Sequence, residues 1–304
     1  LRQRRAAMAE QAVMAGHNAA MSRVLACSTA EGAVQEQAGG ITFLRWLADL
    51  ERDFPARFPA LAEELKGLAR RVFCRARMTA SITGGNKPAA EAAVRILSGS
   101  LPEGVFAPPA AASIRPWGPR REGIVIPSDV SFSAVGGVFR GAGSGTAKVM
   151  GRMVSLAHLW NTVRVQGGAY GTGMILRDIG FAGFFSYRDP SAARTLDCCR
   201  ASADFLRGIA ETDLTGMIIG AAAESEPLLT ARMKGKTADA RYWRQITHDD
   251  LCRVRREMLS ATPDDLTALA DSVGELAAQG AVCVLGPRHQ VDACAEWLDS
   301  VLVL

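Results

Sequence analysis

The segments able to form strands are few, and they come in neighbouring pairs along the chain. Ile124–Phe139 is rich in β-branched and aromatic residues, and Tyr170–Leu176 is followed closely by Gly180–Tyr187. Helical patterns fill most of the remainder and also follow one another in pairs. A doubly wound sheet needs strands that alternate with helices, whereas neighbouring strands form antiparallel pairs. The sequence therefore predicts an α+β fold of two layers, with antiparallel-rich sheets and helices packed on one face.

The other elements follow from hydrophobic period and turn residues. Helices are expected over residues 1–30, 41–54, 61–73, 87–98, 146–160, 191–209, 213–223, 248–260, 263–279 and 290–301. Short strands are expected over residues 77–83 and 282–285, and residues 230–247 are expected to be polar and irregular.

One segment has the composition of a linker. Residues 101–121 carry five prolines, two of them adjacent, together with Gly104 and Gly118, and show no periodicity. We therefore expect part of one domain over residues 1–100, a linker over 101–122 and a complete domain over 123–304.

Composition and charge exclude several classes of protein. With 48% hydrophobic residues and mixed charge, the chain is not expected to be disordered. Its longest apolar stretches fall far short of the roughly 18 to 20 residues of a membrane span. The net charge is +4, and no basic stripe carries aromatic residues suited to stacking bases, so nucleic acid is not an expected partner.

Histidine is too scarce for a zinc site built by this chain alone. His17, His158, His248 and His289 are isolated from one another, and neither H-E-x-x-H nor H-x-x-E-H occurs. We expect no metal ligand in this chain, and we expect His158, on an apolar helix, to be a packed side chain. Seven cysteines without C-x-x-C indicate buried free thiols in a reducing compartment.

A glycine-rich turn over residues 141–146 precedes a predicted helix and has the position of an anion-binding loop. It lacks the Gly-Lys-Ser/Thr ending of a phosphate loop. We therefore expect no nucleotide site there.

The segment 161–190 is the most distinctive of the chain. Gly167 and Gly168 allow a sharp turn or a close approach of backbone to a ligand, and Arg164 and Tyr170 flank them. A guanidinium offers fixed donors to a carbonyl, and a tyrosine hydroxyl can donate to a developing oxyanion. From these residues alone, a tight helix-to-strand turn and a binding site are equally good interpretations.

Several segments together resemble one known family. Arg164-Val-Gln-Gly-Gly-Ala-Tyr170-Gly, followed by Ser186-Tyr-Arg-Asp-Pro190, resembles the C-terminal half of pitrilysin/insulinase-type zinc metallopeptidases, in the presequence protease branch. Other matching segments follow in order: Gly16-His17 with Arg23, Gln37-Ala-Gly-Gly-Ile41, Ala80-Ser-Ile-Thr83 and Ile126-Pro-Ser128.

The resemblance implies a half-bowl from an enzyme that degrades unstructured peptides in a closed chamber. It implies that residues 1–100 are the later part of a third peptidase-like domain and that residues 123–304 are the fourth. It also implies that Arg164 and Tyr170 stabilise the substrate and the oxyanion, and that Gly167, Gly168 and Ala169 contact the substrate. Zinc would be bound by the N-terminal half of the same polypeptide, which is the expected partner together with the peptide substrate.

An alternative of another class stays open at this point: a non-catalytic partner or binding subunit of the same superfamily. An H-x-x-E-H motif upstream of Leu1 would favour the enzyme. The opening residues have the character of mid-helix sequence, so we expect a piece of a longer polypeptide, inactive by itself. The expected compartment is the bacterial cytoplasm, or the mitochondrial matrix or plastid for a eukaryotic source.

Overall fold

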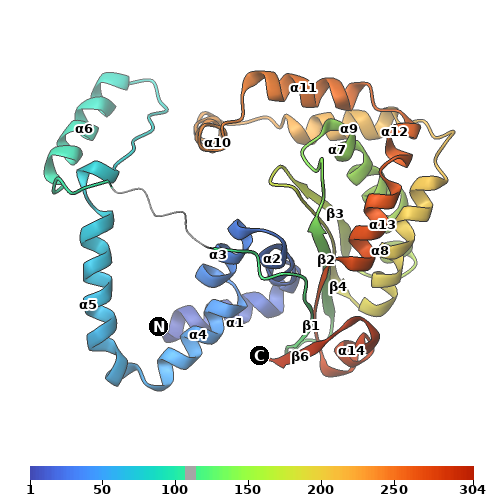
Figure 1. Ribbon diagram of the computed structural model, residues 1–304, viewed down its shortest axis with the longest axis horizontal. Helices are drawn as coiled ribbons and strands as arrows, with labels where there is room; N and C mark the ends of the chain where they lie inside the picture. Colours follow the sequence, from blue (N-terminus) through green and yellow to red (C-terminus); the bar gives the residue numbers. More distant parts are fainter. Residues whose placement is uncertain (107–113) are drawn as a thin grey trace. The chain divides into compact units, whose positions relative to one another are not determined.

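Figure 1 shows the computed structural model of the chain, in which residues 1–106 and 114–304 are described. The helices are α1 Arg2–Met14, α2 Gly16–Ser28, α3 Ala30–Gly39, α4 Ile41–Arg52, α5 Phe54–Val72, α6 Lys87–Ser100, α7 Gly145–Met153, α8 Ala192–Arg207, α9 Thr215–Ser225, α10 Ala231–Trp243, α11 His248–Leu259, α12 Pro263–Thr267, α13 Ala270–Gln279 and α14 Arg288–Asp292. The strands are β1 Arg121–Val125, β2 Ser131–Val138, β3 Gly171–Arg177, β4 Phe181–Asp189, β5 Ala281–Gly286 and β6 Ser300–Val303. Two short 3-10 turns, η1 Arg75–Arg77 and η3 Ala295–Trp297, and a π-helix, η2 Val154–Val165, complete the described elements.

The chain forms two compact units, each assembled from separated stretches of sequence. The first contains residues 1–49, 114–225 and 252–304, and the second contains residues 50–113 and 226–251. These units follow packing rather than chain order. The division into successive peptidase-like domains at 1–100 and 123–304, joined by 101–122, remains a prediction.

A six-stranded mixed sheet forms the centre of the first unit, in the order β3-β4-β2-β5-β1-β6. Three neighbouring pairs, β3 with β4, β4 with β2 and β2 with β5, are antiparallel, and β1 pairs in parallel with β5 and β6. On β2, Val135 lies between Phe184 of β4 and Val282 of β5. The predicted α+β class with an antiparallel-rich sheet is confirmed.

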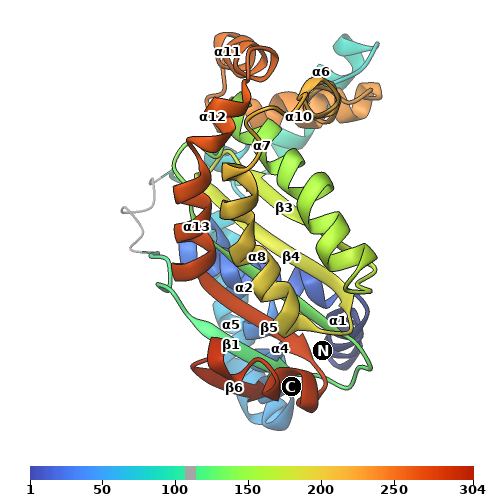
Figure 2. The ribbon, with the colours of Figure 1, turned by 90° about the vertical axis from the view of Figure 1, so that its right-hand side faces the viewer.

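Helices cover both faces of this sheet, which corrects the predicted single helical face. The helix α2 lies on one face of the sheet, and α8 and α13 lie on the other (Figures 1 and 2). Phe132 and Ala134 of β2 belong to the core beneath α2, whereas Val135, which follows Ala134 and points to the opposite face, belongs to the core beneath α8 and α13. The physical reason lies in the strands, because both alternating sets of β5 side chains are apolar and buried. Each face then needs its own layer of helices.

A buried ion network fixes α2 against the sheet and the neighbouring helices. The Arg23 guanidinium donates twice to the Glu122 carboxylate on β1, at 2.7 and 2.6 Å, and once to Glu36 of α3, at 3.3 Å. It also donates to Thr42 of α4, at 2.8 Å. Burial by itself would lower the pKa of Arg23, but the hydrogen bonds and negative charge of its carboxylate partners raise it. Arg23 therefore stays charged inside the protein, because its guanidinium is hydrogen-bonded to two carboxylates and a hydroxyl.

The predicted helices correspond to observed ones over residues 41–54, 61–73, 87–98 and most later segments. The predicted strand over residues 77–83 is wrong: residues 75–77 form a 3-10 turn, and residues 78–83 form no regular element. Ser81 in this segment donates a hydrogen bond to Asp239 on α10, at 2.6 Å. A strand needs the backbone of a partner, and no strand occurs among the described residues of the second unit.

Two further predictions at the level of single elements are wrong. Residues 230–247 contain α10, a helix capped at Thr230 whose polar surface has no apolar stripe to reveal it. The predicted last helix over 290–301 is divided into α14, a 3-10 turn and β6, because the chain turns back to pair Ser300–Val303 with β1.

Candidate functional site

The distinctive segment begins on a π-helix, Val154–Val165, that continues directly from α7. The N–H of Gln166 donates to the Asn161 carbonyl, five residues earlier, at 3.0 Å. Side chains of Ser155 and Thr162 donate to carbonyls four residues before them, which competes with a regular α-helical pattern. Single-turn π segments are common at functional sites, and this longer one carries Arg164 at its end.

Buried contacts on the inner side of the π-helix hold it in place. His158 is 8% exposed, stacks on Phe205 at 5.0 Å between ring centroids, and places Nε2 2.9 Å from the Cys198 carbonyl oxygen of α8. Leu159 and Val163 are buried in the same core. The prediction that His158 is a packed side chain is confirmed.

The loop that follows is a tight turn made possible by its two glycines. A Cβ on Gly167 would collide with the Val163 carbonyl oxygen, and Gly168 has a φ of +80°. The N–H of Gly168 donates to the Arg164 carbonyl, and the N–H of Ala169 donates to that of Val163. Since the side chain of Ala169 is buried, any contact of this residue with a substrate goes through its main chain.

Arg164 and Tyr170 lie together on the outer side of this turn. The Cζ atom of Arg164 is 5.7 Å from the centroid of the Tyr170 ring and 3.9 Å from that of Trp160. Tyr170 is 65% exposed, and its ring meets that of Tyr187 edge-on at 5.7 Å. Among the described residues, neither the Arg164 guanidinium nor the Tyr170 hydroxyl has a hydrogen bond or an ion pair. Both groups can therefore donate to a ligand.

The predicted helix-to-strand turn is confirmed, and the interpretation of this segment as a binding site stays a prediction. Its glycines form a helix-to-strand connection, in which the N–H of Tyr170 donates to the carbonyls of Tyr187 and Arg188 at 3.0 and 3.2 Å. The Arg164 and Tyr170 side chains that flank them converge, and neither has a hydrogen-bond or ion-pair partner among the residues that the structure describes. Trp160, which the sequence predicted only as the end of a helix, joins them and is exposed over 39% of its surface.

The part of the chain that the structure describes contains no group of three or more His, Cys, Asp or Glu side chains placed to hold a metal ion. His17 lies far from such a role, because it packs edge-on against Tyr187 at 4.7 Å, and burial lowers the pKa of its imidazole. The residues that the structure describes do not fit a zinc site.

The glycine-rich turn before α7 is filled by the protein itself. The Glu257 carboxylate accepts the N–H of Gly145 at 2.7 Å, and Ser144 caps the helix by accepting from Ala147. Burial would raise the pKa of Glu257, but the hydrogen bond from the Gly145 N–H and the charge of Arg253 lower it. A carboxylate of the same chain thus occupies the position that an anion would take.

The cysteines are free thiols, most of them buried. Cys27, Cys74, Cys199, Cys283 and Cys294 are buried, and burial raises the pKa of Cys27 to about 11. Burial also raises the pKa of Cys199, Cys283 and Cys294, so these thiols and that of Cys27 are protonated and unreactive at neutral pH. They contribute packing, as the sequence analysis predicted.

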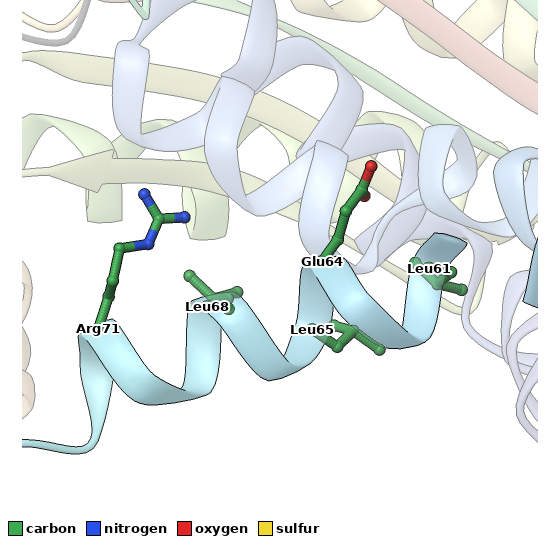
Figure 3. Close-up of a pocket in the computed structure, with 6 residues that line it drawn as sticks. Leu61, Glu64, Leu65, Leu68 and Arg71 are labelled. Atoms are coloured by element: carbon green, nitrogen blue, oxygen red, sulfur yellow. The ribbon is translucent and has the colours of Figure 1, made fainter. Parts of the chain in front are cut away.

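A shallow hollow on α5 is a weaker candidate site. Figure 3 shows that Leu61, Leu65 and Leu68 share this helix with Glu64 and Arg71. All of the lining residues come from one helix, so nothing encloses a ligand, and we assign the hollow no function. Among the described residues, no helix combines the length and the hydrophobicity required to cross a lipid bilayer.

The fold and the loop define an α+β domain that presents an unpaired arginine and tyrosine on a turn, without a metal-binding cluster in its described part. The model of the PreP C-terminal domain family matches residues 121–285, more than half of the chain. The chain therefore belongs to the family of presequence protease C-terminal domains, as the resemblance predicted.

Two relatives are similar over nearly the whole chain. Protein HypA of Clostridium perfringens is 26% identical over 99% of this chain and 31% of its own length. Presequence protease 1, chloroplastic/mitochondrial, of Arabidopsis thaliana is 28% identical over 96% of this chain and 28% of its own length. The chain thus spans less than a third of either relative. Among solved structures, a peptidase M16 inactive domain from Pseudomonas fluorescens aligns with a TM-score of 0.45 and 18% identity, covering 67% of this chain and 51% of that one.

Proposed function

We propose that this chain is the C-terminal, non-zinc-binding half of a zinc metalloendopeptidase that degrades unstructured peptides in a closed chamber. Its partners are the peptide substrate and the N-terminal half of the same polypeptide, which carries the zinc. The chain alone is expected to be inactive. The Arabidopsis relative is named as chloroplastic and mitochondrial, whereas Clostridium is a bacterium; our proposal for this chain is the bacterial cytoplasm, with an organelle as the alternative for a eukaryotic source.

The observation that carries this proposal is the convergence of Arg164 and Tyr170, both with free donors, on one turn. In peptide hydrolysis, negative charge develops on the oxygen of the scissile carbonyl. A tyrosine hydroxyl and a guanidinium held beside that oxygen stabilise the charge as it forms. Arg164 and Tyr170 are proposed to take this role, with the main chain of Gly167, Gly168 and Ala169 beside the substrate.

The test is Tyr170→Phe in the complete polypeptide. Removing one oxyanion donor costs about 2.7 to 4 kcal/mol, so we expect kcat to fall about a hundredfold or more. Hydrolysis of an unstructured peptide that carries a fluorophore and a quencher measures kcat and KM.

Tyr242→Phe is the matched control, because Tyr242 is similarly exposed, at 73%, and lies on α10 against Trp243. That variant should keep its turnover, and the thermal unfolding of both variants should match that of the parent protein. A Tyr170→Phe enzyme with normal kcat would contradict the assigned role. Absence of hydrolysis by the unsubstituted complete polypeptide would instead favour the alternative of a non-catalytic binding subunit.

A further inference from the structure

The Arg164 guanidinium lies over the face of the Trp160 indole. The distance from Cζ to the ring centroid is 3.9 Å, well inside the limit of about 6 Å for a cation–π contact. The Tyr170 ring is farther from the same atom, at 5.7 Å. Trp160 is therefore the nearer of the two aromatic supports of Arg164.

A cation–π contact differs from an ion pair because it leaves the N–H donors of the guanidinium free. The donors of a guanidinium point outward in its plane, so a ring against its face fixes its orientation without consuming an N–H. A carboxylate partner would occupy two of these donors. In the part of the chain that the structure describes, Arg164 has no carboxylate or carbonyl partner.

Trp160 is itself held by a rigid element. It directly follows two buried residues of the π-helix: His158, bound to α8 through the Cys198 carbonyl, and Leu159, which is fully buried. The indole projects from this anchored segment with 39% of its surface exposed. Its position is therefore set by the core, whereas Tyr170 lies on the turn that follows.

We propose that Trp160 is a positioning residue, which holds the Arg164 guanidinium by its face so that the in-plane donors remain directed at the substrate backbone. The inference rests on the proposed role of Arg164. It adds a residue that acts through Arg164 and requires no contact between Trp160 and the scissile bond.

The first test compares Trp160→Phe, which keeps an aromatic face, with Trp160→Leu, which keeps only apolar bulk, in the complete polypeptide. Loss of a partly exposed cation–π contact should lower kcat/KM about three- to tenfold in Trp160→Leu, and less than about twofold in Trp160→Phe. The loss in Trp160→Leu should divide between kcat and KM as it does in Arg164→Leu, and it should be smaller. In the Arg164→Leu background, Trp160→Leu should have no further effect.

Trp46→Leu is the control, because Trp46 is also 39% exposed and stacks on Phe43 away from Arg164. It should leave both kinetic constants unchanged. Equal losses in Trp160→Phe and Trp160→Leu, or additive losses with Arg164→Leu, would overturn the inference, since both indicate packing alone. If Arg164→Leu itself has no effect, the proposed function fails; if Arg164→Leu is impaired and Trp160→Leu is normal, only the inference fails.

The second test needs no catalysis and uses the 304-residue chain. The Nε–Hε signal of Arg164 in the proton–nitrogen NMR spectrum is identified by its absence in Arg164→Lys. An aromatic face against the guanidinium shifts this proton upfield, so we expect the shift to persist in Trp160→Phe and to disappear in Trp160→Leu. An unchanged chemical shift of the Arg164 Hε proton in Trp160→Leu would contradict the proposed contact.

Discussion

Arg23 and Arg164 both lie against a tryptophan, yet the protein uses them in opposite ways. The Arg23 guanidinium is 4.9 Å from the Trp117 ring and is also bound by Glu36 and Glu122. Arg164 is 3.9 Å from Trp160 and has no carboxylate partner in the described structure. An arginine whose donors are bound by buried carboxylates contributes to the architecture, whereas one held only by its face keeps its donors for a ligand.

The same substitution at the two positions provides the sharpest contrast, and Arg23→Leu should have the larger effect on stability. It leaves Glu36 and Glu122 buried without a cation, which typically costs about 3 to 5 kcal/mol. Urea unfolding of the chain, followed by circular dichroism, measures the change. A loss below about 1 kcal/mol would show that the network is not structural. The triple variant with Glu36→Gln and Glu122→Gln should recover part of the loss, because the buried charges are then gone.

Gly168→Ala tests whether the turn that follows Arg164 requires glycine for its stability. Gly168 has a φ of +80°, where an L side chain costs about 1 to 2 kcal/mol, so the free energy of unfolding should fall by that amount. Gly216→Ala is the control, because a Cβ there meets no atom within 4 Å and Gly216 lies on helix α9. Equal stability of the two variants would show that the turn tolerates an ordinary residue.

Arg164→Leu should have the smallest effect on stability. It removes a partly exposed cation–π contact to Trp160 at 3.9 Å and a longer one to Tyr170 at 5.7 Å, so the free energy of unfolding should fall by about 1 kcal/mol. The same urea titration measures it, while hydrolysis by the complete polypeptide should fall strongly. A loss of unfolding free energy as large as that of Arg23→Leu would show that Arg164, like Arg23, has a structural role.

The two sites also differ in how far the sequence predicts them. Arg164 and Tyr170 are six residues apart, on either side of two glycines, so local geometry brings them together and the sequence analysis identified both. Trp160 was missed, although an aromatic residue four positions before an arginine on a helix places the two side chains on one face. Arg23 and Glu122 are separated by 99 residues, and nothing in the local sequence of either one indicates the other.

The same division applies to the elements. Apolar periodicity predicted α4 and α8 because each buries one face, but α10 has a polar surface and was taken for a loop. The alternating segment 77–83 was predicted as a strand, yet it forms none, since a strand depends on a partner that periodicity does not reveal. The sequence also did not reveal that helices cover the second face of the sheet, because the helix that covers it, α2, comes from a distant part of the chain.

By itself, the sequence determined the α+β class, the glycine turn and the arginine and tyrosine that flank it, because these depend on neighbouring residues and on local backbone freedom. Only the tertiary structure decided which charged groups are paired and which remain free. The reason is physical: a guanidinium has the same donors wherever it stands in the sequence, and its role depends on whether distant parts of the chain bring a carboxylate to it or leave it stacked on a ring.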